Sequence, residues 1–146
     1  QMGKIVGPDE LKQLVERLRT EGKKLVFTNG CFDIIHTGHI RYLKEAKALG
    51  DVLIIGLNSD TSVSAIKPGR PVNPQDQRAE VLSSLEMVDY VTLFDEETPY
   101  ALIKLLQPDI LVKGRDETDG ACSETHGMGG KHKVAKDDAH VRETGA

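Results

Sequence analysis

The sequence predicts an α/β fold built on a Rossmann-like, doubly wound parallel sheet, and two observations carry this prediction. Apolar runs typical of strands alternate with amphipathic helical segments along most of the chain. The strand candidates also have uniformly apolar centres, as in VLIIGL at residues 52–57. Such centres are expected where helices cover both faces of a parallel sheet. The crossovers of this sheet are expected to be right-handed.

The individual elements follow from local patterns. A first helix is expected over residues 8–22, because apolar residues recur at helical spacing at Leu11, Leu14, Val15 and Leu18. Strands are then expected at residues 23–30, 51–60, 89–95 and 109–114. Helices are expected at residues 39–50, 75–87 and 98–107. The segment PGRPVNP, residues 68–74, predicts a loop because proline and glycine interrupt both patterns.

The alternating pattern ends near Gly114, and this predicts the domain organisation. One domain is expected over residues 1–116, with an N-terminal helix within 1–22 and an α/β core over 23–116. Residues 117–146 form a divergent polar tail. From Gly114 to Ala146 there is no Leu, Ile, Phe, Tyr or Trp, so little apolar burial offsets the entropy of ordering the backbone. The tail is therefore expected to be weakly ordered or to depend on a partner.

Composition excludes several classes of function. The net charge of −4 gives no general attraction to nucleic acid or to anionic lipid, so neither partner is expected. No apolar run approaches the roughly 20 residues of a membrane span, and no signal-peptide pattern opens the chain, which predicts a cytoplasmic protein. Cys31 and Cys122 form no CxxC or metal-ligand spacing, so reduced thiols and no protein-bound metal are expected.

The first strand-to-helix turn, TNGCFDIIHTGH at residues 28–39, is the candidate site. In an open parallel sheet, ligands bind at the carboxyl ends of strands, and a helix N-terminus there favours an anion. His36 and His39 can project to one side of a helical turn and donate to phosphate oxygens, while Gly30 and Gly38 allow close approach. A lone histidine is more often a surface or satisfied core residue, the pair at this spacing could instead bind zinc, and Asp33 could be only a cap or turn former. Their order after a strand favours a phosphate-handling site, although the spacing matches neither GxGxxG nor the P-loop.

The same stretch carries a family resemblance. GCFDIIHTGH resembles the HxGH signature of the cytidylyltransferase-like nucleotidyltransferase superfamily. Over about Lys23 to Asp116 the wider sequence resembles the adenylyltransferase domain of bacterial ADP-heptose synthases. The segments that carry this narrower likeness are NGCFD, GRPVNPQDQRAEVLSSLEMVDYV, FDEETP and QPDILVKG.

The resemblance implies an enzyme, an adenylyltransferase. It would transfer AMP from ATP to a small phosphorylated sugar, D-glycero-β-D-manno-heptose 1-phosphate, giving ADP-heptose for lipopolysaccharide and releasing pyrophosphate. Mg²⁺ is expected to arrive with ATP, and a homodimer is a possible assembly. Two alternatives stay open: a cytidylyltransferase or an FAD-synthetase-like adenylyltransferase with another phosphorylated acceptor, and a nucleotide-binding module without catalysis.

The resemblance also implies roles for particular residues. The expected catalytic residues are His36, His39, Lys67 and Arg78. The expected nucleotide contacts at the first turn are Asn29, Gly30, Phe32, Asp33 and Gly38, with Asp33 organising a metal or a basic side chain, and Arg70 is an expected substrate contact. The places of other residues at strand ends, where an open parallel sheet binds ligands, predict further contacts: Lys113, Gly114 and Asp116 to the nucleotide, and Gly56, Asn58 and Asp60 to the substrate.

Each role has a structural alternative. Lys67 and Arg78 could be solvated surface charges, and Asn58 and Asp60 could cap the next helix. Lys113 could be held in a salt bridge, and Gly114 could only form a turn.

The tail departs from the family pattern. Glu117 stands where the family has an aromatic residue, and no Ser/Thr-rich motif follows to contact ATP phosphates. The histidines at 126, 132 and 140 do not replace it by spacing. This predicts weak nucleotide affinity or turnover, or missing contacts supplied by another chain.

Overall fold

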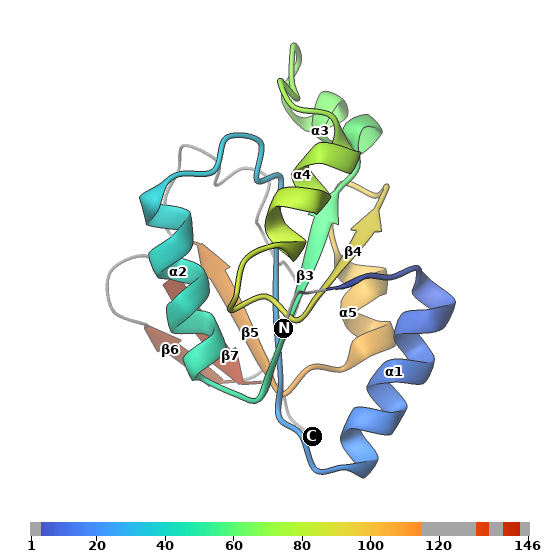
Figure 1. Cartoon of the computed structure of the whole chain (residues 1–146), viewed down its shortest axis with the longest axis vertical. Coiled ribbons are helices and arrows are strands. Elements are labelled where there is room, and N and C mark those ends of the chain that lie inside the picture. The colour runs from blue at the N-terminus through green and yellow to red at the C-terminus, as the bar shows by residue number, and fades with distance from the viewer. Residues whose placement is uncertain (1–3, 115–130, 135–138, 144–146) are drawn as a thin grey trace.

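The computed structural model describes residues 4–114, 131–134 and 139–143. Within these residues the sheet has the strand order β1-β4-β3-β2-β5-β7-β6 (Figure 1). Its strands are β1 (Lys4–Ile5), β2 (Leu25–Gly30), β3 (Val52–Asn58), β4 (Tyr90–Phe94), β5 (Ile110–Gly114), β6 (Lys131–Val134) and β7 (Ala139–Glu143). Its helices are α1 (Pro8–Thr20), α2 (Thr37–Ala48), α3 (Asp60–Ile66), α4 (Gln75–Ser83) and α5 (Tyr100–Leu106).

The five strands β1, β4, β3, β2 and β5 are parallel to one another, which confirms the predicted Rossmann-like α/β fold. Two additions were not predicted. The short strand β1 pairs with β4 at one edge, and β7 pairs antiparallel with β5, followed by β6, at the other. The backbone pairing that forms β6 and β7 does not depend on an apolar pattern, which is why the sequence of the tail did not predict them.

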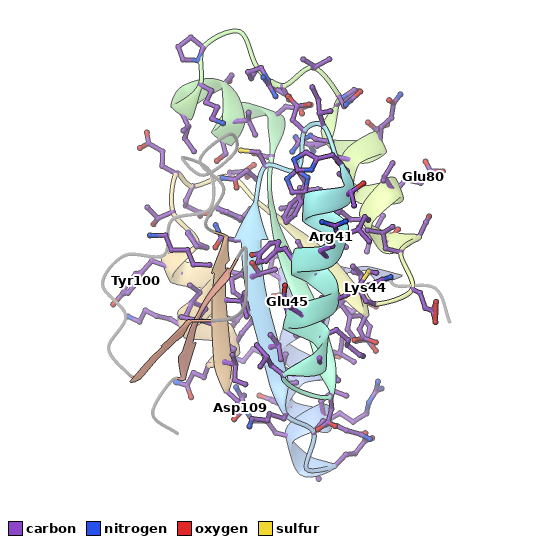
Figure 2. The ribbon with its side chains drawn as sticks, turned by 90° about the vertical axis from the view of Figure 1, so that its left-hand side faces the viewer. Arg41, Lys44, Glu45, Glu80, Tyr100 and Asp109 are labelled. Carbon is purple, nitrogen blue, oxygen red and sulfur yellow. The ribbon has the colours of Figure 1, made fainter. Side chains whose placement is uncertain are left out.

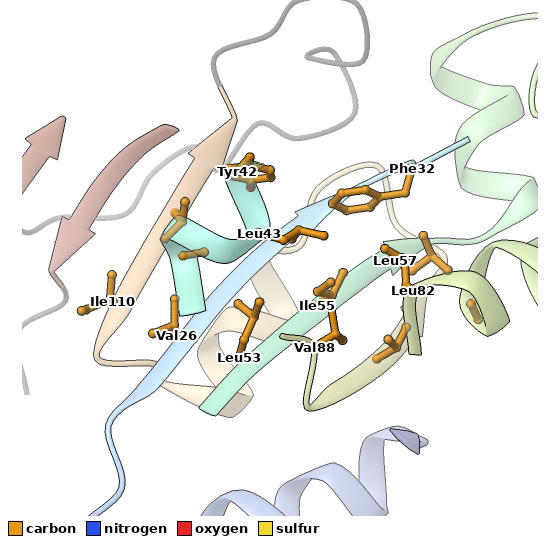
Figure 3. Close-up of a cluster of buried hydrophobic side chains, with 14 residues drawn as sticks. Val26, Phe32, Tyr42, Leu43, Leu53, Ile55, Leu57, Leu82, Val88 and Ile110 are labelled. Carbon is orange, nitrogen blue, oxygen red and sulfur yellow. The ribbon is translucent and has the colours of Figure 1, made fainter. Parts of the chain in front are cut away.

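Alternation along β3 sends side chains to two separate cores. Leu53, Ile55 and Leu57 enter a cluster beneath α2 and α4, which Figure 3 shows. Ile54 enters a second cluster, beneath α1 and α5. The predicted apolar face of the first helix is confirmed, because Leu11, Leu14, Val15 and Leu18 are all buried in that second cluster.

Helix α2 is amphipathic and lies over β2 and β3. Tyr42 and Leu43 are buried on its inner side, while Arg41 and Lys44 are exposed (Figure 2). The helix begins at Thr37, two residues earlier than the sequence predicted, because His36 caps it. Within the described part of the chain, every helix is too short or too polar to cross a membrane.

Candidate nucleotide site

The candidate site lies where β2 and β3 end side by side at the carboxyl edge of the sheet. Strand β2 is hydrogen-bonded to both β3 and β5, so it is central, and the turn of residues 31–36 leads from it into α2. Strand β3 ends at Asn58 and leads through Ser59 into α3. Parallel strands bring such turns together, as expected for a ligand crevice.

His36 and His39 form a reciprocal cap at the start of α2. The amide of Gly38 donates to Nδ1 of His36 over 3.0 Å, and the amide of His36 donates to Nδ1 of His39 over 3.2 Å. The centroids of the two rings are 4.2 Å apart. Because each Nδ1 accepts a hydrogen bond, each neutral imidazole carries its proton on Nε2. The two histidines are thus both helix caps and oriented Nε2–H donors.

Two glycines make room for the rings of this turn. A Cβ on Gly38 would lie 2.7 Å from Cε1 of His36, and a Cβ on Gly30 would lie 2.9 Å from Cε2 of Phe32. Phe32 has a φ of 46°, the left-handed region, and its ring lies 5.5 Å from that of His39. Gly30 and Gly38 therefore allow aromatic rings to fold over the backbone where the strand meets the helix.

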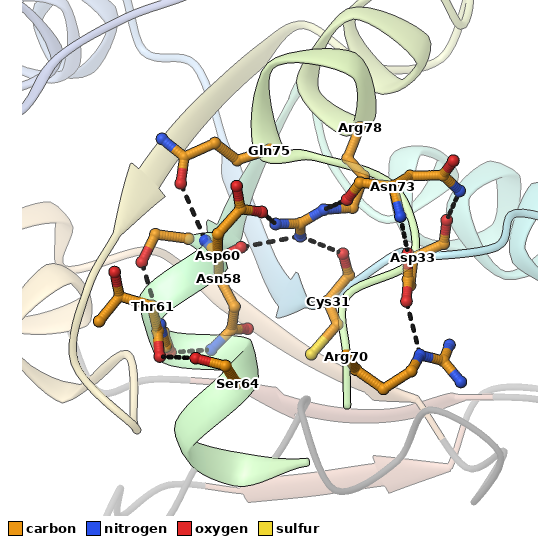
Figure 4. Close-up of polar contacts among 12 residues, drawn as sticks. Cys31, Asp33, Asn58, Asp60, Thr61, Ser64, Arg70, Asn73, Gln75 and Arg78 are labelled. Atoms are coloured by element: carbon orange, nitrogen blue, oxygen red, sulfur yellow. Dashed lines mark hydrogen bonds and ion pairs between the residues drawn. The ribbon is translucent and has the colours of Figure 1, made fainter. Parts of the chain in front are cut away.

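Asp33 is the acceptor at the centre of a polar network (Figure 4). Its carboxylate accepts from Nε of Arg70 over 2.7 Å and from the amides of Val72 and Asn73, each over 2.8 Å. Burial acts to raise the pKa of Asp33, but the two amides and Arg70 outweigh it, so the pKa lies below its usual value. Asp33 is thus ionised at neutral pH and organises a basic side chain, one of the two roles expected for it.

Arg78 lies buried at the first turn of α4, and its guanidinium bonds to several segments at once. It donates to three backbone carbonyls, those of Asn73 over 2.9 Å, Cys31 over 2.7 Å and Asn58 over 2.8 Å. It also donates to Oδ1 of Asp60 over 2.8 Å. The catalytic role predicted for Arg78 stays a prediction, but the observed contacts are those of a brace between the ends of β2 and β3.

The residues at the end of β3 have clear local roles. Nδ2 of Asn58 donates to the hydroxyl of Ser62, and Ser59, rather than Asn58 or Asp60, caps α3. A Cβ on Gly56 would lie 2.7 Å from Cζ of Phe27 and 3.1 Å from Cδ2 of Leu102. Gly56 thus has a packing role inside the sheet, and substrate contact by Gly56, Asn58 or Asp60 stays a prediction.

The remaining predicted residues lie on the surrounding segments. Lys67 caps the C-terminus of α3, and the side chain of Arg70 is about one-third exposed beside Asp33. Asn29 is the buried residue before Gly30 on β2. Lys113 and Gly114 end β5, next to β2, whereas Asp116 lies outside the described residues.

Two residues that take part in the hydrogen-bond network around Asp33 and Arg78 were not predicted from the sequence. Asn73 bonds to both Asp33 and Arg78, and Oε1 of Gln75 accepts from the amide of Asp60 over 2.8 Å. Asn73 stands between Val72 and Pro74, where it had no feature beyond that of an ordinary loop residue. The only available signal was its place in the GRPVNP segment.

One expectation about Cys31 is wrong. Cys31 is disulfide-bonded in the structure, so it is not the reduced thiol that was expected. The spacing of cysteines in the sequence does not reveal their pairing, and Cys122, the other cysteine of the chain, lies outside the described residues.

A hollow of about 310 Å³ adjoins the network. It is lined by Phe32, Asp33, Ile34, Ile35, Asn73, Gln77, Arg78 and Val81. Across the described residues, histidine, cysteine and carboxylate side chains gather nowhere in a group of three that could hold a metal ion. The carboxylate of Asp33 is already occupied by Arg70 and two amides, so it is not arranged as a ligand for a hard cation such as Mg²⁺.

A central parallel strand that turns into a helix capped by HxGH defines a nucleotide-binding α/β domain of the nucleotidyltransferase class. The chain belongs to the cytidylyltransferase-like family, whose model matches residues 27–142, and it is a nucleotidyltransferase. The resemblance stated from the HxGH signature is thereby confirmed.

Curated relatives and a solved structure agree with this assignment. The bifunctional protein HldE of Aliarcobacter butzleri is 60% identical over 109 residues, covering 74% of this chain and 23% of the relative. That of Wolinella succinogenes is 57% identical over 114 residues, covering 77% and 24%. The chain thus spans about a quarter of the length of these relatives. A lipopolysaccharide core biosynthesis protein from Thermoplasma volcanium is 36% identical with a TM-score of 0.59, over 66% of this chain and 78% of that one.

Proposed function

We propose that the chain transfers AMP from ATP to a sugar 1-phosphate, D-glycero-β-D-manno-heptose 1-phosphate, and so forms ADP-heptose and pyrophosphate. The observation that carries this proposal is the reciprocal capping of His36 and His39, which orients two Nε2–H donors at the N-terminus of α2. The high identity to proteins named HldE supports adenylyl transfer in ADP-heptose synthesis.

The proposed reaction is an in-line displacement at the α-phosphorus of ATP. A phosphate oxygen of the sugar phosphate forms the new bond to that phosphorus, and the bond to the bridging oxygen of the β-phosphate breaks. Pyrophosphate leaves with that oxygen. The attacking oxygen is already anionic at neutral pH, so no strong general base is required. The site must therefore mainly align the two phosphates and stabilise their charge.

The described residues are suited to this task. His36 and His39 donate to the triphosphate from Nε2, and the positive end of the α2 dipole lies beside them. Lys67, at the C-terminus of α3, and Arg70, beside Asp33, would add positive charge to balance the phosphates. Mg²⁺ bound to the phosphates of ATP would lower the negative charge that opposes attack. A cytoplasmic location, where ATP is available, and a homodimer remain predictions.

Pyrophosphate release from the purified chain tests the proposal. ATP and CTP are each supplied with Mg²⁺ and with heptose 1-phosphate, with another sugar 1-phosphate, or with riboflavin 5′-phosphate. We expect release to be fastest with ATP and heptose 1-phosphate. Faster release with CTP, or with riboflavin phosphate, would replace the proposed substrates with those of the alternative transferases. ATP binding without release from any pair would instead indicate a nucleotide-binding module.

A further inference from the structure

The loop of residues 67–74 joins α3 to α4, and polar contacts hold it against the turn before α2. Val72 is 64% exposed and no residue of the loop is buried, so apolar burial contributes little there. Its described attachments to that turn are instead the hydrogen bonds from Arg70, Val72 and Asn73 to Asp33.

Asn73 makes three of the bonds around this loop. Its amide donates to Oδ1 of Asp33 over 2.8 Å, and its side-chain Nδ2 donates to the backbone carbonyl of Asp33 over 2.5 Å. Its own carbonyl accepts from Nε of Arg78 over 2.9 Å. Asn73 is therefore bonded on one side to the turn that carries the histidines and on the other to the brace between β2 and β3 (Figure 4).

We propose that Asn73 is a positioning residue that docks this loop and thereby aims Arg70 at a substrate phosphate. The coupling passes through Asp33, because one carboxylate binds both the loop amides and Nε of Arg70. If the loop undocks, the carboxylate loses its amide donors, and the guanidinium loses its fixed direction.

Arg70 has the donors that this role requires. Asp33 engages only Nε, and among the described residues no partner is recorded for the two Nη groups. A guanidinium fixed on its Nε edge presents its remaining N–H groups as a planar donor pair, which suits a phosphate. The phosphate could belong to ATP or to the acceptor sugar, since both present the same oxygens.

Asn73 could stabilise the loop without affecting a ligand, so its positioning role is tested by measuring both the opening of the loop and the affinity for ligands. Asn73→Asp keeps the size of the side chain but turns the Nδ2 donor into an acceptor facing the carbonyl of Asp33. Asn73→Ala removes the donor without adding charge, and it replaces Asn73→Asp in the same measurements if the aspartate variant does not fold. Gln13→Glu adds the same charge at an exposed position on α1 and is the matched control.

Two measurements are made on the full chain. Amide hydrogen exchange at Arg70, Val72 and Asn73, whose backbone N–H groups all donate in the docked loop, is expected to be at least about tenfold faster in the Asn73 variants and unchanged in Gln13→Glu. Calorimetric titration with MgATP, and separately with heptose 1-phosphate, is expected to show about tenfold weaker binding of at least one ligand. The ligand that is affected identifies the phosphate that Arg70 contacts.

A double-mutant cycle shows whether Asn73 acts by directing the Arg70 guanidinium or only by stabilising the loop. Arg70→Gln should weaken binding of the same ligand, and it should weaken it much less once Asn73 is already changed. Unchanged exchange, unchanged affinities, or independent effects of the two substitutions would each overturn the proposal. The phosphate role rests on the proposed function, yet the two can fail separately. If the chain releases pyrophosphate but the effects of the Asn73 and Arg70 substitutions on binding are fully additive, only the docking role of Asn73 is contradicted. If the two substitutions are coupled in binding but no pyrophosphate is released, only the transferase function is contradicted.

Discussion

Among the single residues of the site, His36 and His39 combine a structural role with a proposed chemical one. The Nδ1 atom of each ring accepts a hydrogen bond from a backbone amide, which fixes the start of α2 and leaves the proton of the neutral ring on Nε2. A substitution by alanine removes both roles together, so loss of activity in such a variant would not show which role mattered.

His36→Asn separates the two roles. Asparagine is a good N-cap, so its side-chain oxygen can accept from the amide of Gly38, but it lacks the Nε2–H donor. We expect urea unfolding to show a loss of about 1 kcal/mol for His36→Ala and less for His36→Asn. Turnover should fall about a hundredfold or more in both, because an oriented donor is lost. Normal turnover in His36→Asn would mean that the histidine only caps the helix.

Asp33 makes the stability of the fold depend on pH. Because its folded pKa lies below the usual value, its contribution is present above the unfolded pKa and is lost as pH falls through the folded pKa. Asp33→Asn should lower the free energy of unfolding at pH 7 by about 1 to 3 kcal/mol. The difference between wild type and variant should shrink as pH falls below the usual aspartate range. Urea unfolding from pH 7 to pH 3 measures it, and a constant difference would contradict the network.

Among the elements, the start of α2 depends on Gly38, because the absence of a side chain there leaves room for the ring of His36 against the helix N-terminus. Gly38→Ala favours the helix by propensity, but its Cβ would lie 2.7 Å from Cε1 of His36 and must displace the ring. We expect turnover to fall at least about tenfold while the melting temperature stays within about 3 °C, since the gain in propensity offsets part of the lost cap. Thermal unfolding and pyrophosphate release on one preparation check this, and an active Gly38→Ala would refute it.

Gly56 provides the contrasting case within β3. A Cβ there would press on Phe27 and Leu102 in the core beneath α5, away from the histidines. Gly56→Ala should cost about 1 to 3 kcal/mol of stability, the range for overpacking, and should leave turnover per folded molecule near wild type. A stable variant with weakened substrate binding would instead support the substrate contact predicted from the sequence.

The sequence predicted the main elements because their signals are local. The apolar spacing of α1 and the continuous apolar run of β3 each lie within one short window. The histidine pair was found for the same reason. The brace was not predicted, because Arg78 reaches carbonyls 47 and 20 residues away in the sequence. No local pattern distinguishes such an arginine from a solvated one, and Asn73 likewise resembled an ordinary turn residue.

In the whole molecule, the sheet brings the carboxyl ends of β2 and β3 together, and Arg78 links them. Strands β2 and β3 lie side by side in register. The buried guanidinium of Arg78 donates to the carbonyl of Cys31, just after β2, and to that of Asn58, the last residue of β3. The histidine turn, the loop of residues 67–74 and the start of α4 are thus held as one unit. Such a rigid frame suits a reaction whose catalysis depends mainly on alignment.

Adenylyl transfer to a sugar phosphate at this site can be followed directly by isotope labelling. Heptose 1-phosphate labelled with ¹⁸O in its phosphate is incubated with MgATP and the chain, and both products are analysed by mass spectrometry. ADP-heptose is expected to retain all of the label and pyrophosphate to contain none, because the sugar phosphate oxygen attacks the α-phosphorus. Label in pyrophosphate, or no ADP-heptose from a chain that binds both substrates, would rule out this reaction.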